Sequence, residues 1–169
     1  MRVTASPQAW QSFLYTAAHN YHTTYLNQLL IHVQRPDAAA CASMEYWNTK
    51  ANRLVMCGSR SITVLQRRQG VAVTKPVFAI GDTTPLSQTR TGGPWEVTDI
   101  TRPLLLQDKS DDWLAALAQE GVSNEADRAR RMLERNVADS TLQWAQPDEQ
   151  MSLLQELVTQ SAVYMARLR

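Results

Sequence analysis

The chain has 169 residues, of which 44% are hydrophobic, and its 17 basic and 16 acidic side chains give a net charge of +1. This length is enough for one domain with a sizeable core, and we expect a single domain over residues 1–169. Because there is no uncharged apolar window of about 18 residues and no apolar signal-peptide core at the N-terminus, we expect a cytoplasmic protein without a membrane partner.

Two or three helices are predicted in the first fifty residues. Ser6 and Pro7 can begin the first helix, and Thr24 can cap the second, which Pro36 ends. Ser43 can cap a third, short helix. The first two carry apolar side chains at helical spacing, namely Trp10, Phe13, Leu14, Ala17, Ala18 and Tyr21 in one and Leu26, Leu29, Leu30 and Val33 in the other. The small residues 38–42 let the backbone pass close to its surroundings.

A small antiparallel sheet is predicted between residues 61 and 80. The β-type runs 61–66 and 71–74 are joined by Arg67-Arg68-Gln69-Gly70, which indicates a hairpin with a basic tip. A third apolar run, 76–80, begins at Pro76, where a missing donor is tolerated. Residues 49–60 indicate a turn around Gly58, and residues 82–94 have the composition of a loop.

The pattern turns helical in the last third of the chain. Three helices are predicted, with Gly121 ending the first and Ser123 or Asn124 capping the second; they span Asp111 to Glu120, Asn124 to Asp139 and Asp148 to Leu168. The expected fold class is therefore α+β, with a core in residues 1–95 and a mainly helical section, 96–169, packed on it.

Charge is unevenly distributed along the chain. Residues 46–95 hold seven bases against Asp82 alone, giving +6, whereas residues 96–127 hold eight acids against two bases, giving −6. If the two blocks stay apart in space, one face can attract a polyanion and the other a basic partner. If they pack together, their charges cancel.

The cysteines and histidines do not form a metal-binding pattern. Cys41 and Cys57 lie far apart without a CxxC pair, which argues against a zinc ribbon or a disulfide framework. His19 and His22 are spaced i, i+3, but a zinc site needs a third and usually a fourth ligand, and His32 has no obvious carboxylate companion. We therefore expect no metal and no cofactor.

The stretch from Asn27 to Trp47, NQLLIHVQRPDAAACASMEYW, combines an apolar helical stripe, a helix-ending proline, a run of small residues and a capped short helix. It resembles the N-terminal domain of ArdC-type antirestriction proteins, as found at the start of large helicase and methyltransferase-like proteins of conjugative elements. The resemblance extends to further segments, namely 10–14, Gly58, 62–65, 75–80 and 161–164.

The resemblance implies binding of single-stranded DNA, in which the ArdC-type domain is implicated. Single-strand binders combine a basic groove with aromatic side chains on which bases stack. Core packing is the alternative for Tyr46 and Trp47, and a solvated hairpin tip is the alternative for Arg67 and Arg68. The candidate nucleic-acid-binding residues are Arg35, Tyr46, Trp47, Lys50, Arg53, Arg60, Arg67, Arg68 and Lys75, with Tyr25 as a further stacking platform.

The family pattern after the short helix, of the form G-R-x-V-K-K-G-x-K-G, is kept only in part. Met56 and Cys57 stand where bases are expected, and Ser61 replaces a glycine. Each lost phosphate contact removes a counterion-release contribution to affinity, so this loop can contact protein instead. The residues that match are Arg53, Val55, Gly58 and Arg60.

No catalytic motif is present: the HExxH helix of the metallopeptidase half of ArdC-type proteins is missing, as are GxxxxGK[ST], GxSxG and GxGxxG. We expect a non-enzymatic anti-defence (antirestriction or anti-CRISPR) or DNA-transfer accessory protein of a mobile genetic element in a bacterial host. It would bind single-stranded DNA through the basic turn and hairpin, with no small-molecule substrate. The alternative is an inhibitor that binds a CRISPR or restriction nuclease through its acidic segment and helices, which rests on analogy.

Overall fold

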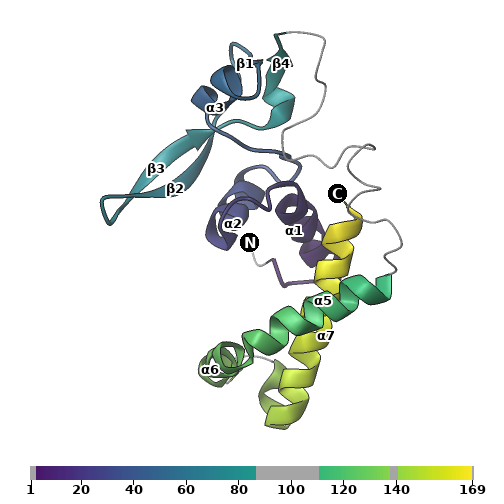
Figure 1. Cartoon of the computed structure of the whole chain (residues 1–169). Coiled ribbons are helices and arrows are strands. Elements are labelled where there is room, and N and C mark those ends of the chain that lie inside the picture. The colour runs from purple at the N-terminus through teal and green to yellow at the C-terminus, as the bar shows by residue number, and fades with distance from the viewer. Residues whose placement is uncertain (1–2, 87–110, 138–140, 169) are drawn as a thin grey trace. The chain divides into compact units, whose positions relative to one another are not determined.

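A computed structural model describes residues 3–86, 111–137 and 141–168 (Figure 1). Its contacts divide the chain into two compact units, Met1–Leu104 with Leu168–Arg169, and Leu105–Arg167. Helices and two small antiparallel sheets confirm the predicted α+β class. The packing of the helical section on the core, as one domain, stays a prediction.

The three N-terminal helices form where the capping residues predict them. They are α1 (Pro7–His19), α2 (Tyr25–Gln34) and α3 (Met44–Thr49). The side-chain oxygens of Ser6, Thr24 and Ser43 accept the otherwise unpaired N–H groups of the three first turns. Helix α2 ends before Pro36, at the C-cap residue Arg35.

The fully buried Asn20 fixes the small-residue run against the end of α1. Its Nδ2 donates to the carbonyls of Thr16 and Ala38, at 2.9 and 2.8 Å, and its Oδ1 accepts the N–H of Cys41 at 2.8 Å. The N–H of Ala40 donates to the carbonyl of His19. The prediction that residues 38–42 pass close to their surroundings is therefore confirmed.

Strands β2 (Ile62–Arg68) and β3 (Val71–Val77) form the hairpin. Its turn is the pair Gln69-Gly70, with φ of 50° and 83°, as in the two-residue turns that match strand twist. Two predictions are corrected: Arg67 and Arg68 end β2 rather than forming the connection, and Pro76 lies inside β3 rather than starting a third strand. Pro76 pairs with Thr63, whose backbone bonds point away from β3, so the missing N–H costs no ladder bond.

A second sheet, which the sequence does not predict, pairs β1 (Arg53–Val55) with β4 (Thr83–Pro85). The one-turn 3-10 helix η1 (Ile80–Asp82) leads into β4. Strands of three residues are too short to show a period in the sequence. The turn at Gly58, with φ of 85°, is confirmed, whereas most of the predicted loop 82–94 lies outside the described residues.

Side-chain amides of α2 cover the outer edge of β2. Asn27 bonds both the N–H and the carbonyl of Leu65, each at 2.9 Å. Gln34, two turns later, does the same for Thr63, at 2.9 and 2.8 Å. The helix thereby satisfies backbone groups that would otherwise be unpaired at a sheet edge. Beneath it lies a core of Ile31, Ala38, Cys41, Ile62, Val64, Val77 and Ala79.

The second unit is helical, with α5 (Asp111–Asn124), α6 (Ala126–Asn136), a 3-10 turn η3 (Thr141–Trp144) and α7 (Pro147–Arg167). Helix α5 continues through Gly121, so the predicted stop there is wrong, and α6 is preceded by Glu125 rather than by a cap at Ser123 or Asn124. A glycine inside a helix costs only about 1 kcal/mol, which packing of α5 along α7 can offset. Among the described helices none is both long and apolar enough to cross a membrane.

Candidate nucleic-acid interface

Trp47 belongs to the core, so the prediction that its ring stacks on bases is corrected. Its exposed fraction is 0%, and its Nε1 donates to the carbonyl of Phe78 at 2.9 Å. It packs with Ala40 and Phe78, which is the core-packing alternative. It also makes an edge-on contact with Tyr46, with ring centroids 6.1 Å apart and 76° between the planes. Trp47 therefore supports the neighbouring ring.

Two of the predicted phosphate-binding arginines bind groups within the fold. The Arg35 guanidinium donates two hydrogen bonds to the Asp82 carboxylate, at 2.7 and 2.9 Å, and this contact raises the pKa of Arg35. Arg53 is 8% exposed and donates to the hydroxyl and the carbonyl of Thr83, at 2.6 and 3.1 Å. The assignment of Arg53 is corrected, because a phosphate would have to displace its partners, whereas the half-buried Arg35 is already paired with a carboxylate that competes with phosphate. Asp82 is the one acid in residues 46–95, and this isolated acid in a basic segment was the sequence signal for an internal ion pair.

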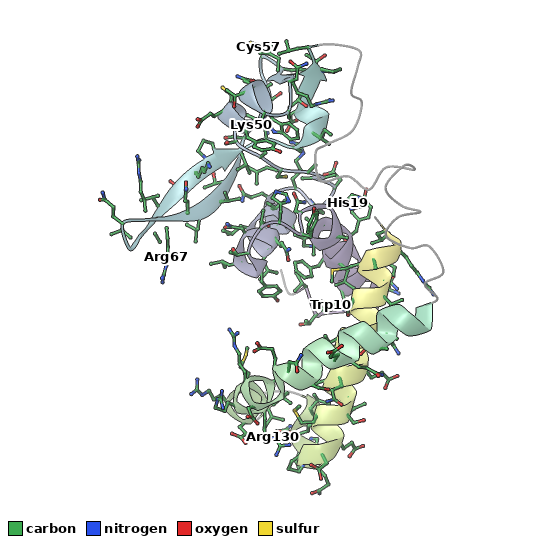
Figure 2. The ribbon with its side chains drawn as sticks, in the orientation of Figure 1. Trp10, His19, Lys50, Cys57, Arg67 and Arg130 are labelled. Carbon is green, nitrogen blue, oxygen red and sulfur yellow. The ribbon has the colours of Figure 1, made fainter. Side chains whose placement is uncertain are left out.

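The other predicted cations remain accessible. Lys50, Arg60, Arg67 and Arg68 are exposed and Lys75 is half-buried, and no described acid pairs with any of them. Arg67 and Arg68 are consecutive strand residues, so they project from opposite faces of the hairpin. Figure 2 shows Arg67 on the hairpin and Lys50 near α3. The basic tip predicted from the sequence is present, although it is made of strand residues.

A groove of about 380 Å³, here called the hairpin groove, lies at the base of the hairpin. It is formed by the start of α2, the start of α3 and the two long strands. Tyr46 and Lys75, both predicted site residues, line it together, and burial raises the pKa of the Tyr46 hydroxyl. Further lining residues include His22, Thr24, Asn27, Ser43, Val64 and Val77, which no sequence motif pointed to.

Tyr25, the third predicted stacking platform, does not line the hairpin groove. It is 59% exposed and contacts the Phe13 ring edge-on, with centroids 5.7 Å apart. The structure thus brings together one of the predicted aromatics with one of the predicted bases, and leaves Tyr25 as a separate exposed ring.

The groove holds few groups that could act as a nucleophile or bind a metal. Burial raises the pKa of the Cys41 thiol to about 12, which keeps it protonated and unreactive near neutral pH. His22 lies with its Nε2 3.3 Å from the Cys41 carbonyl. Within the part of the chain that the structure describes, no three His, Cys, Asp or Glu side chains gather as a metal site would require.

Three of the eight acids in the acidic segment invoked by the alternative function, Glu96, Asp99 and Asp108, lie outside the described residues. Of its described acids, Glu125 faces Arg128 at 3.6 Å in an exposed pair. Exposed pairs of this kind contribute little to stability. The protein-directed alternative therefore stays a prediction.

Comparison of the chain with protein-family models, with curated proteins and with solved structures finds no match. The resemblance to the ArdC-type domain is therefore carried by the residues of the chain alone. It stays a prediction, as do a cytoplasmic location and the absence of catalysis.

Proposed function

We propose that this chain is a non-enzymatic single-stranded DNA-binding protein with an anti-defence or DNA-transfer role on a mobile genetic element. The observation that carries the binding proposal is the meeting of Tyr46 and Lys75 in the hairpin groove, at the base of a basic hairpin. The mobile-element role follows from the ArdC-type resemblance.

The two predicted residues of the hairpin groove suit the two parts of a nucleotide: Tyr46 can stack on the base, and Lys75 can bind the phosphate. An aromatic ring gives a stacking surface that every base can use, and a lysine supplies a mobile point charge for phosphate. The groove volume of about 380 Å³ is at the small end of the roughly 300–1,000 Å³ of small-ligand sites. Its aromatic ring and lysine suit an unstacked base and the neighbouring phosphate, which a single strand presents more readily than a duplex.

The surrounding charge favours a polyanion. Residues 3–86 contain seven bases and three acids, giving +4. Arg35 and Arg53 are held by partners within the fold, which leaves five accessible cations from α3 to β3. Cations that neutralise phosphates release condensed counterions, the main source of sequence-independent affinity. A strand seated in the hairpin groove would continue along the same face of the hairpin to Arg68, which shares that face with Val64 and Lys75.

The test is fluorescence anisotropy of a labelled single-stranded oligonucleotide, with a duplex of equal length, at two salt concentrations. Tyr46→Leu removes the aromatic face while keeping a bulky apolar side chain, and a lost stacking contact of roughly 1–3 kcal/mol corresponds to about a 5- to 150-fold weaker Kd. Tyr46→Phe keeps the face and should bind like wild type. Lys75→Gln should weaken binding and reduce its salt dependence.

Tyr25→Leu is the matched control, since Tyr25 is exposed and lies outside the hairpin groove. Equal affinity of wild type and Tyr46→Leu would remove the groove from the proposal. Absence of binding at low salt would reject single-stranded DNA altogether, and co-elution with a purified nuclease in the absence of DNA would then favour the protein-directed alternative.

A further inference from the structure

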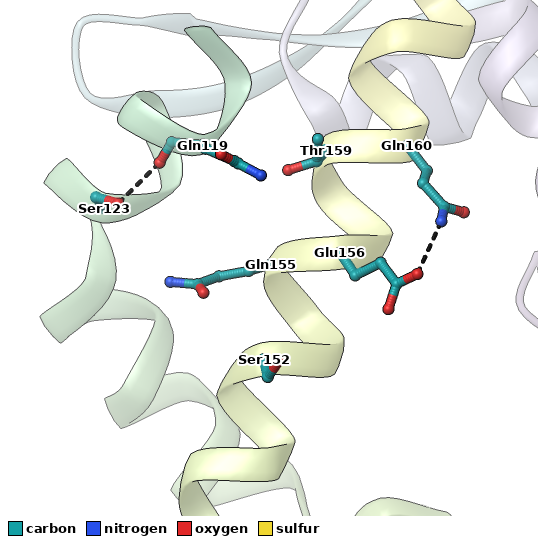
Figure 3. Close-up of a pocket in the computed structure, with 7 residues that line it drawn as sticks. All are labelled: Gln119, Ser123, Ser152, Gln155, Glu156, Thr159 and Gln160. Carbon is teal, nitrogen blue, oxygen red and sulfur yellow. Dashed lines mark hydrogen bonds between the residues drawn. The ribbon is translucent and has the colours of Figure 1, made fainter. Parts of the chain in front are cut away.

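A second groove, of about 530 Å³, lies in the helical unit between α5 and α7 and is here called the interhelix groove (Figure 3). Its described lining residues are all polar. Gln119 and Ser123 come from α5, and Ser152, Gln155 and Thr159 come from α7. Packed helices ordinarily meet through apolar side chains, because burial of apolar surface drives their association. Gln119, Ser123 and Ser152 are exposed and Gln155 is half-buried, so these amides and hydroxyls line the mouth of the groove and are accessible to a ligand.

Thr159 is the one buried side chain among the described lining residues of the interhelix groove. The residue is 9% exposed, and its Oγ1 is buried without a hydrogen-bond partner. A threonine in a helix can bond the carbonyl one turn earlier, which would satisfy the hydroxyl locally. Here the hydroxyl has lost its water without gaining a partner, an arrangement that is rare in folded proteins. Figure 3 shows its oxygen on the side of α7 that faces α5, directed toward the Gln119 amide, with the Gln155 amide extending toward α5 from the preceding turn of α7.

The lining chemistry restricts the ligand. None of the described lining residues is basic, so a phosphate or carboxylate group finds no counter-charge. The one acid, Glu156, accepts a hydrogen bond from Gln160 at 3.0 Å and lies on the side of α7 away from α5 (Figure 3). A cation is therefore not favoured either. What remains is a neutral ligand that both donates and accepts hydrogen bonds.

A side-chain amide presents a donor and an acceptor side by side, which matches the edge of a nucleobase; glutamine pairs in this way with adenine. We propose that the interhelix groove binds a nucleobase, held by the amides of Gln119 and Gln155 and by the Thr159 hydroxyl. The base can belong to a free nucleoside or to a nucleic-acid strand. The nucleoside case is independent of the proposed function, and only the strand case rests on it.

The experiment titrates the full chain with adenosine, guanosine, cytidine and thymidine, and with sucrose as a neutral polyol, while the ¹⁵N-labelled glutamine side-chain amides are followed by NMR. The expected result is a saturable shift of the Gln119 and Gln155 amides with a nucleoside and none with sucrose. A parallel titration with a single-stranded oligonucleotide separates the strand source from the free nucleoside. Shifts with sucrose, or with none of these probes, would overturn the proposal.

Thr159→Val is the sharpest variant, because it replaces one hydroxyl by a methyl group of similar shape. It should weaken nucleobase binding by about tenfold or more, while Tm stays the same or rises because an unpartnered polar group has been removed. Gln155→Met should also weaken binding. Gln146→Met makes the same exchange at an exposed glutamine outside the groove and should change nothing.

A higher Tm for Thr159→Val with unchanged affinity would show that the hydroxyl is only a packing defect, and would overturn the proposal. Failure of the single-stranded DNA proposal is distinguishable from this outcome. Tyr46→Leu should weaken the oligonucleotide without altering the nucleoside-induced shifts, since Tyr46 lies in the other unit.

Discussion

His32 is a fully buried histidine whose tautomer can be derived from its neighbour. Thr16 Oγ1 lies 2.6 Å from the carbonyl of Pro36 and 2.9 Å from His32 Nδ1. The carbonyl can only accept, so the single hydroxyl proton goes to it, and Nδ1–H must donate to Thr16. His32 Nε2 is then a bare lone pair, buried without a partner and beside the edge-on ring of Phe13.

Burial lowers the pKa of His32, because the protonated ring would place an N–H and a charge in this apolar surrounding. The unfolded chain binds the proton more readily than the folded chain, so stability is lost as pH falls below the ordinary value of 6.5. Urea unfolding at pH 7.5, 6.5 and 5.5 should show the free energy of unfolding decreasing by at most about 1.4 kcal/mol per pH unit from this group.

His32→Gln should flatten the pH dependence at a lower overall stability, because the buried ring that resists protonation is removed. An unchanged slope in His32→Gln would assign the acid sensitivity to other groups.

At the scale of elements, α2 and β2 are joined by two side-chain amides that differ in exposure. Asn27 bonds Leu65 in a partly buried position, while Gln34 bonds Thr63 at an exposed one. Without the amide, water can reach the backbone of Thr63 more easily than that of Leu65. The hydrogen bonds of Asn27 should therefore stabilise the fold more than those of Gln34, even though the bonding geometry of the two amides is the same.

Asn27→Ala should reduce the free energy of unfolding by about 1–3 kcal/mol, because it leaves partly buried backbone groups unpaired. Gln34→Ala should cost about 0.5 kcal/mol, since solvent replaces the amide. Chemical denaturation of both variants, with amide hydrogen exchange at Leu65 and Thr63, measures the difference. Equal losses in the two variants would contradict the role given to burial.

At the scale of the whole molecule, net charge conceals the distribution that matters for binding. The total is +1, but five accessible cations lie in the first unit. If all five contact phosphates of a single strand, the slope of log Kobs against log salt should approach about −3.5, at roughly 0.7 per contact. Arg68→Gln should reduce the slope by about 0.7 without changing base preference. A slope near zero would mean that binding, if observed, is not carried by phosphate contacts.

The sequence predicts the elements whose signals are local. Ser6, Thr24 and Ser43 mark three helix starts, and the glycine-containing connection between two β-type runs marks the hairpin, although not its exact turn, because capping and turn geometry depend on a few adjacent residues. Strands β1 and β4 were missed, since they are short and joined by contacts between Arg53 and Thr83, thirty positions apart in the chain. The predicted helix end at Gly121 was wrong because tertiary packing offsets the small free-energy cost of a glycine inside a helix.

The site was predicted only in part for the same reason. Residue type identifies Arg35 and Arg53 as cations but not the partners that hold them, and it identifies Tyr46 and Trp47 as aromatics but not which of the two is buried. The hairpin groove and the interhelix groove each join segments that are distant in sequence. Neither groove has a motif, so only the three-dimensional arrangement reveals it.

Strand β3 pairs with β2 along one edge, and its other backbone edge is uncovered. No described residue bonds the outward-facing groups of Ala72 and Thr74, whereas the opposite edge of the hairpin is covered by α2. An open edge is a template on which another chain can add a strand. Arg67 and Arg68 place positive charge on both faces beside it, so two hairpins approaching each other are repelled. The arginines proposed to attract DNA should therefore also oppose self-association of the protein. Variants that remove their charge should bind DNA more weakly and be less soluble.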